Sequence, residues 1–227
     1  MATQFSDATF QFLADLRAHN DRDWFNAHKA DYEQNARDPA LAMVADMVLE
    51  LPKLSPFFIA DPRPVGGSLM RIFRDTRFAK DKSPYKTAIA ARFHHKDGQE
   101  GSTPGFYVRI EPGKSGVGGG MWQPETRTLD AIRQKIVDEP ERWTAITRGH
   151  TMRSSCGFMG ESLKRAPQGF DPNHPLIEDL KRKDFALSIP LADDDVKRPD
   201  FVQTLVKTLG ETAPFVRFLS EACGLQF

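Results

Sequence analysis

The sequence predicts an α+β fold built around one antiparallel sheet. Apolar residues recur at helical spacing through residues 6–52 and again over 124–227, where one further strand interrupts them. Between these regions, the strand-rich residues 64–122 show a period nearer two. Helices followed by strands and then helices are typical of an α+β domain rather than of alternating βαβ units. We expect a single domain over 1–227, with four or five strands covered by the N-terminal and C-terminal helices.

Three helices are expected in the first fifty residues. Residues 6–18 place one set of side chains on a single helical face: Thr9, Phe12, Leu13 and Leu16. Asp21 can cap a second helix. Asp38 and Pro39 begin the third, as a cap followed by proline at the first helical position, and Pro52 ends it.

The central region predicts strands. Residues 65–73 and 87–94 have a period near two, and residues 105–111 carry the clearest alternation in the chain. The glycine-rich residues 117–122 form another short run. The connections between the later runs are too short for crossover helices, so the sheet is expected to be antiparallel.

The C-terminal region is expected to return to helices. Helical spacing resumes after Pro124, and residues 185–191 form one more predicted strand. Pro199 begins a helix that Gly210 is expected to end, and a last helical face follows with Phe215, Phe218, Leu219 and Ala222.

The overall composition excludes some classes of protein. Lysine plus arginine equals aspartate plus glutamate at 31 each. This balance disfavours a protein that binds nucleic acid or a membrane surface over most of its own surface, because such proteins usually carry a strong basic surplus. The opening residues have no signal-peptide pattern, and no apolar stretch approaches the ~18–20 residues of a spanning helix. Cys156 and Cys223 have no metal-like spacing. We therefore expect a reduced cytoplasmic protein with no membrane association and no metal.

One stretch, residues 71–86, concentrates positive charge. It holds six basic residues and only two acidic ones in a chain that is neutral overall. If these side chains converge, the forked guanidinium groups of arginine and the ammonium groups of lysine can bind phosphate or carboxylate oxygens. A long ordered loop between strands is also often functional. The candidate ligand-binding residues are Arg71, Arg74, Asp75, Arg77, Lys80, Lys82, Tyr85 and Lys86.

A structural ion-pair network is the alternative interpretation of this stretch. Asp75 and Asp81 would neutralise nearby arginines while Phe73 and Phe78 anchor the loop. Two acids cannot balance six bases locally, which favours an anion site. In that site we expect Asp75 to orient one neighbouring guanidinium group, leaving Arg77 to face the ligand.

Secondary candidates lie outside the basic stretch. Trp24, His28 and Tyr32 share one face of the second predicted helix, where His28 and Tyr32 could act as acid/base partners, although a packed histidine is more common. Trp122 is either a core residue or a stacking platform. The preceding Gly118–Gly120 could approach a ligand, but glycines in a crowded strand explain them better.

Three motifs together carry a family resemblance. They are residues 20–29 with Tyr32, then Arg71 to Lys86, then Gly118 to Pro124. The chain resembles a family of conserved proteins known as domain of unknown function 2461, over nearly its full length. The resemblance implies no established activity, cofactor or catalytic residue, so the cofactor stays unknown.

Two classes of function follow from the basic stretch. The first is a small-molecule binding protein or enzyme that holds a phosphate- or carboxylate-bearing ligand with residues 71–86. The second is an interaction module that binds an acidic protein or a nucleic-acid backbone through the same residues. A concave pocket beside the loop favours the first, and a convex basic face with exposed aromatic side chains favours the second.

Overall fold

The computed structural model describes residues 5–98, 103–149 and 156–227, and this part of the chain is α+β, as predicted. The opening residues that lack a signal-peptide pattern lie partly outside it. Its strands form one antiparallel sheet in the order β1-β2-β3-β4-β6-β5. Four of them match predicted runs: β2 (Ile89–His95), β3 (Gly105–Ile110), β4 (Gly116–Met121) and β6 (Phe185–Pro190).

The sheet has six strands where four or five were expected. The two that sequence periodicity missed are β1 (Phe58–Ile59) and β5 (Gly157–Met159). Two or three residues are too few to show an alternation. The predicted strand at 65–73 is not a continuous strand. Its first residues belong to a turn in which Gly66 has φ 72°, and the described segment meets the sheet at one isolated bridge, between Leu69 and Ala91.

The helices flank the sheet in sequence, as predicted. They are α1 (Asp7–Ala18), α2 (Arg22–Ala27), α3 (Lys29–Tyr32), α4 (Asp38–Glu50), α5 (Thr126–Asp138), α6 (Pro140–Arg148), α8 (Ile177–Leu180), α9 (Asp193–Val196) and α10 (Phe201–Ala222). Asp21 caps α2, since its Oδ1 accepts a hydrogen bond from the Trp24 N–H at 2.9 Å. A π-helical segment, Glu33–Arg37, joins α3 to α4 without a break. It lies just before Pro39, whose ring disturbs the regular hydrogen-bond pattern.

Helix α10 corrects one expectation. Gly210 was predicted to end this helix, yet the helix continues through Gly210 and Pro214 to Ala222. A glycine costs about 1 kcal/mol and a proline about 3 kcal/mol inside a helix. Each large apolar side chain that is fully buried contributes about 1.5–3 kcal/mol. Phe215, Phe218 and Leu219 are buried beyond the proline, so tertiary packing outweighs the two local breakers.

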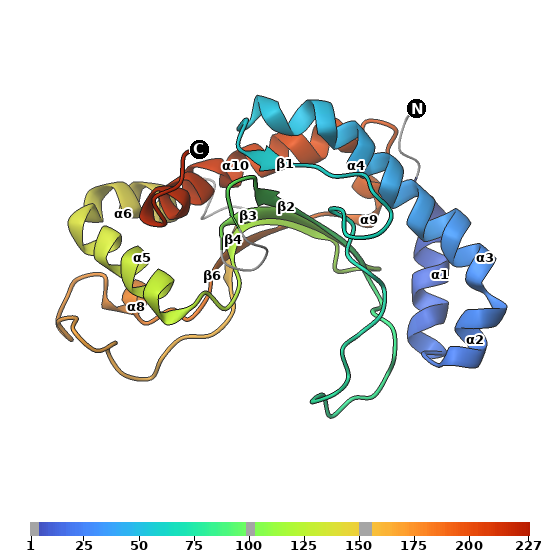
Figure 1. Ribbon diagram of the computed structural model, residues 1–227, viewed down its shortest axis with the longest axis horizontal. Coiled ribbons are helices and arrows are strands. Elements are labelled where there is room, and N and C mark those ends of the chain that lie inside the picture. The colour runs from blue at the N-terminus through green and yellow to red at the C-terminus, as the bar shows by residue number, and fades with distance from the viewer. Residues whose placement is uncertain (1–4, 99–102, 150–155) are drawn as a thin grey trace.

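Among the described residues, the core comprises two clusters of buried side chains. In the first, alternate residues of β3 pack against α1, α4 and α10; in the second, Trp143 of α6 packs against Phe185 of β6 and Phe218 of α10. Figure 1 shows α4 and α10 above the arched sheet. Because both clusters contact the same sheet and the same helix, a single domain over 1–227 remains our expectation.

The glycines of β4 let side chains and backbone pack closely on both faces of the sheet. Tyr107 of β3 lies across Gly118, and its hydroxyl donates to the Leu187 carbonyl oxygen at 3.0 Å. A Cβ atom on Gly118 would lie 1.8 Å from that oxygen and 2.8 Å from the Tyr107 ring. On the opposite face, a Cβ on Gly119 would lie 2.3 Å from Val216 of α10. The glycine run therefore belongs to a crowded strand.

Residues 71–86 form the outer end of a two-stranded ribbon. Its stem pairs residues 72–74 with 84–86, through N–H donation from Arg74 to the Pro84 carbonyl and from Lys86 to the Ile72 carbonyl. Residues 75–83, which we call the tip, extend away from the sheet (Figure 1). The stem is held against the α1–α2 connection by the Asn20 side chain, which bonds both the N–H and the carbonyl of Tyr85.

Candidate anion-binding site

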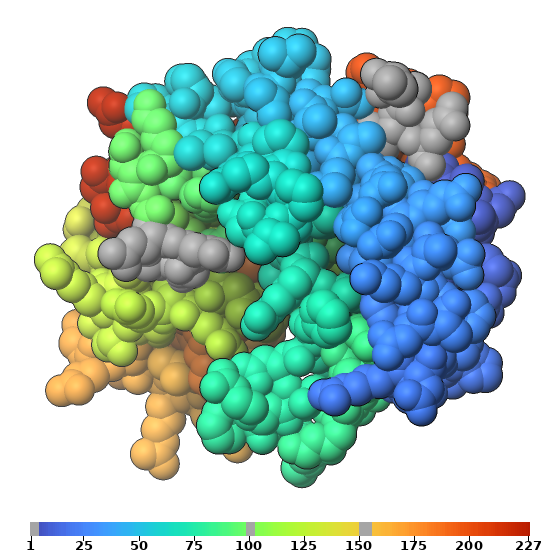
Figure 2. Space-filling view, turned by 45° about the vertical axis from the view of Figure 1, so that its right-hand side comes forward, coloured from blue at the N-terminus to red at the C-terminus, as the bar shows by residue number. Residues whose placement is uncertain are grey.

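A cleft with a volume of about 500 Å³ lies where the ribbon stem meets α1 and the sheet. We call it the stem cleft. Figure 2 shows this part of the chain, in teal and green, beside the blue N-terminal helices. The polar side chains that line it come from four separate stretches of sequence: Arg17, Asn20, Arg74, Asp81, Ser83, Lys86, Thr87 and Arg109. Four cationic side chains thus meet there, with Asp81 as the one carboxylate in its lining.

Glu111, which does not line the cleft itself, binds two of these cations. Its side chain is only 8% exposed, and its two oxygens accept hydrogen bonds from Arg17 at 3.0 Å and from Arg109 Nε at 2.9 Å. Arg17 belongs to α1 and Arg109 to β3, so one buried carboxylate orients guanidinium groups from two elements. Both guanidinium side chains are about half exposed and keep donors free for a ligand.

Arg74 and Asp81 form an ion pair across the ribbon. Arg74 also donates to the Ser83 carbonyl oxygen at 3.2 Å. Asp81 accepts hydrogen bonds from the Ser83 hydroxyl and N–H; these bonds, together with Arg74, hold the pKa of Asp81 well below its usual range. Asp81 therefore stays ionised at neutral pH and keeps Arg74 at the wall of the cleft.

Lys86 is a half-buried cation with no carboxylate bound to it in the described chain. Its Nζ donates to the Arg71 carbonyl oxygen at 2.9 Å. Burial, and then the nearby Arg71 charge, lower the pKa of Lys86 below its ordinary value. A positive charge that is partly desolvated and lacks a counter-ion favours a bound anion.

A second cleft, of about 610 Å³, adjoins the first at Lys86 and follows the outer edge of the ribbon. We call it the edge cleft. Ionisable side chains in its lining are Tyr32, Arg37, Arg71, Asp75, Lys86, Arg92 and His94. Arg37 is paired with Glu33 and Asp38, and Arg92 donates to the Thr103 carbonyl oxygen. Burial raises the pKa of Tyr32, so its hydroxyl stays neutral.

The remaining candidates of the basic stretch lie at the tip. Arg77 is 78% exposed and binds the Asp75 carboxylate with two of its nitrogens, which lowers the pKa of Asp75 to about 2. Lys82 Nζ donates to the Thr76 carbonyl oxygen at 2.9 Å. Arg77, Lys80 and Lys82 line neither cleft. The structure therefore brings Arg74, Tyr85 and Lys86 together in the stem cleft, and Arg71, Asp75 and Lys86 together in the edge cleft.

The Tyr85 side chain packs in the core, where it holds the ribbon stem in place. Its ring is buried and stacks on Phe25 at 4.0 Å between centroids. The neighbouring Phe73 contacts both rings, at 5.5 Å from Tyr85 and 6.4 Å from Phe25. These aromatic contacts fix the stem against α2.

Of the secondary candidates, Trp24 and His28 lie together, while Tyr32 and Trp122 occupy other places. The His28 ring stacks on Trp24 at 4.1 Å, and its Nδ1, which lies 2.8 Å from the Trp24 carbonyl oxygen, acts as the donor. Neither of these residues lines a cleft described above, whereas Tyr32 lines the edge cleft. Trp122 is 54% exposed just beyond the end of β4, so it is not a core residue.

Sequence reasoning missed Arg17, Arg109 and Glu111. The alternation of residues 105–111 does place Arg109 on the face opposite Phe106 and Val108, and Arg109 is exposed there. Strand register alone could not show that this position lines the same cleft as Lys86. Arg17 reaches the cleft only through the packing of α1, for which no local pattern exists.

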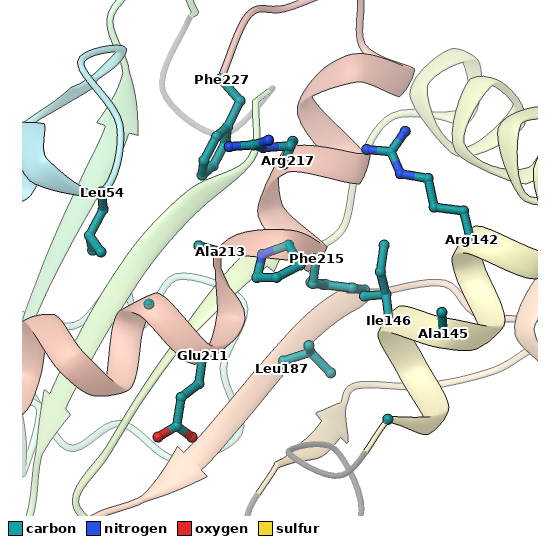
Figure 3. Close-up of a pocket in the computed structure, with 13 residues that line it drawn as sticks. Leu54, Arg142, Ala145, Ile146, Leu187, Glu211, Ala213, Phe215, Arg217 and Phe227 are labelled. Carbon is teal, nitrogen blue, oxygen red and sulfur yellow. The ribbon is translucent and has the colours of Figure 1, made fainter.

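A third cavity of about 640 Å³ borders α10 near Pro214 (Figure 3). Figure 3 shows Phe215, Ile146 and Leu187 in its centre, with Glu211 on the opposite side from Arg142 and Arg217. Arg142 is paired with Glu139 and Glu221, and Arg217 lies over the Phe227 ring at 4.8 Å. Since Arg142 is already neutralised, this cavity offers less to an anion than the stem cleft does.

The described part of the chain contains no group of three or more His, Cys, Asp or Glu side chains arranged to hold a metal ion. No helix there is both long and apolar enough to cross a membrane.

We expect the two cysteines to react slowly with thiol reagents while the protein is folded. Burial raises the pKa of both Cys156 and Cys223 to about 11. The fold therefore favours the neutral thiol, and at pH 8 a shift of this size lowers the reactive thiolate fraction roughly 100-fold. The rate of reaction with an aromatic disulfide reagent, in buffer and in denaturant, measures this protection. Equal rates in the two conditions would show that the thiols are not shielded.

The fold and the site define an α+β protein with an antiparallel sheet and a basic cleft at the stem of a projecting ribbon. The model of one family, conserved hypothetical proteins of domain of unknown function 2461, matches residues 8–218. The chain therefore belongs to this family, as the three motifs indicated. Comparisons with curated proteins and with solved structures gave no match.

Proposed function

We propose that this protein binds a small phosphate- or carboxylate-bearing molecule in the stem cleft. The observation that carries this proposal is Lys86, a half-buried cation without a carboxylate partner in the described chain. Arg17, Arg74 and Arg109 surround the same space, and each is held in place by Glu111 or Asp81. Guanidinium forks oriented in advance, together with a lysine point charge, are suited to anionic oxygens.

Titration with inorganic phosphate tests the proposal. We expect Lys86→Met to weaken phosphate binding about 10- to 100-fold, because a charged hydrogen bond contributes about 1.5–3 kcal/mol. Calorimetry at fixed low salt measures the dissociation constant, since screening weakens such contacts. Arg198→Ala is the matched control: it removes one cation and its ion pair with Asp200, and Arg198 lines neither cleft.

The same titration distinguishes a phosphate site at the tip, which includes Arg77, from a phosphate site in the stem cleft. Sequence reasoning expected Arg77 to face the ligand, whereas the structure leaves Arg77 bound to Asp75 at the tip. We therefore expect Arg77→Ala to change phosphate affinity less than twofold. A loss as large as that of Lys86→Met would move the site to the tip, and unchanged binding in Lys86→Met would refute the stem cleft as the site.

One observation favours the second function, an interaction module. Phe78 is 96% exposed at the tip, among the exposed cations Arg77, Lys80 and Lys82. An exposed aromatic ring beside cations can bind an acidic protein segment or stack on nucleic-acid bases.

The tip can be tested independently of the stem cleft. If the tip binds nucleic acid, Phe78→Ala should weaken binding of a labelled single-stranded oligonucleotide about 5- to 50-fold, since stacking contributes about 1–3 kcal/mol per base. Fluorescence anisotropy over a salt series measures this, and Lys86→Met should leave it unchanged. An acidic peptide in place of the oligonucleotide tests the protein partner. Binding of neither probe would exclude this role for the tip.

A further inference from the structure

The stem cleft and the edge cleft are connected at one side chain. Lys86 lines both, and its Nζ binds the carbonyl oxygen of Arg71, whose own side chain lines the edge cleft. The two cations are close enough for the charge of Arg71 to act on Lys86. Lys86 therefore lies at the boundary of the two clefts, next to the lining of each.

The edge cleft also offers a cation that no described side chain binds directly. Within the described residues the Arg71 guanidinium has no hydrogen bond or ion pair, although the residue is exposed at the cleft wall. Asp75, the carboxylate in the lining of this cleft, is hydrogen-bonded to Arg77, and the Arg71 charge acts on it only as a minor cause of its lowered pKa. Arg37 is already paired with two acids of its own helix. Arg71 is thus the cation in this cleft that is most available to an anion.

We propose that the ligand carries two anionic groups, one bound in the stem cleft by Arg17, Arg74 and Arg109 and the other bound in the edge cleft by Arg71, with Lys86 between them. This inference rests on the proposed function, because it names the chemical class of the ligand for the same site. The class is a small molecule with two phosphate or carboxylate groups a few bonds apart. Two linked groups bind more tightly than one, because the second association is intramolecular.

A series of synthetic probes tests this class. Propylphosphonate supplies one anionic group, and alkane bisphosphonates with one, three or five methylene groups supply two at increasing separation. We expect the best bisphosphonate to bind at least tenfold more tightly than propylphosphonate in calorimetric titrations. Arg71→Ala should remove this gain while leaving propylphosphonate binding within twofold, and Lys86→Met should weaken both. Arg198→Ala should change neither, which controls for the loss of one positive charge.

The outcomes separate this inference from the function on which it rests. If propylphosphonate binding depends on Lys86 but no bisphosphonate gains affinity, the two-group ligand is refuted and the stem cleft stands. If the gain survives Arg71→Ala, the second group lies elsewhere and the inference is equally refuted. Failure of every probe to bind would overturn both proposals.

Amide chemical shifts supply a readout that is independent of variant folding. On the unmodified protein, the bisphosphonate should shift the amides of Arg71 and Asp75 in addition to those of Arg109 and Lys86. Propylphosphonate should shift only the stem-cleft amides, and identical shift patterns for the two probes would contradict the two-cleft arrangement.

Discussion

Gly118→Ala is expected to lower the free energy of unfolding by about 3 kcal/mol or more. Overpacking a core position typically costs about 1–3 kcal/mol. Here the new methyl group would meet a backbone oxygen, that of Leu187 at 1.8 Å, which cannot rotate away. Strand β6 would have to separate from β4, and Tyr107 would lose its place across the glycine. Chemical denaturation followed by far-ultraviolet circular dichroism measures the change.

Gly157→Ala is the matched control for this substitution. Gly157 lies on β5 of the same sheet, and a Cβ atom there would meet nothing within 4 Å. We expect its effect to stay within about 0.5 kcal/mol, as for surface positions generally. If Gly118→Ala were equally harmless, close packing would not explain the glycine, and a role in approaching a ligand would regain support.

Asn20→Ala is expected to cost about 2–3 kcal/mol and to release the ribbon stem. The Asn20 amide donates to the Tyr85 carbonyl oxygen at 2.9 Å, and its Oδ1 accepts from the Tyr85 N–H at 3.0 Å. Alanine would leave both backbone groups unpaired in a partly buried place, where each lost partner costs about 1–3 kcal/mol. Hydrogen exchange of the amides in residues 72–86 should accelerate along with the loss of stability.

Two further substitutions sharpen this test. Asn20→Asp keeps the acceptor for the Tyr85 N–H but loses the donor to the Tyr85 carbonyl oxygen. It should therefore lower the free energy of unfolding while keeping one of the two hydrogen bonds. Asn173→Ala is the control, because no hydrogen bond of the Asn173 side chain is present in the described chain. Faster exchange in Asn173→Ala as well would mean that the ribbon is not held by Asn20 in particular.

The position of the candidate site could be predicted in part. The excess of cations in residues 71–86 pointed to the ribbon, and Arg71, Arg74 and Lys86 do line clefts. Local sequence could not show which cations are neutralised, because that depends on where the chain turns. Because of the turn at the tip, Asp75 forms an ion pair with Arg77, and Asp81 forms an ion pair with Arg74. The Arg71 guanidinium has no hydrogen bond or ion pair among the described residues.

The sequence by itself determined the α+β class, the antiparallel pairing, the longer strands and most helix starts. Each of these follows from local periodicity, from capping residues such as Asp21, or from short connections. Only the tertiary structure decided that α10 runs through Pro214 and that β1 and β5 join the sheet. It alone decided that Arg17 and Arg109, both bound to Glu111, line the same cleft as Lys86, because side chains on separate elements converge only after those elements pack.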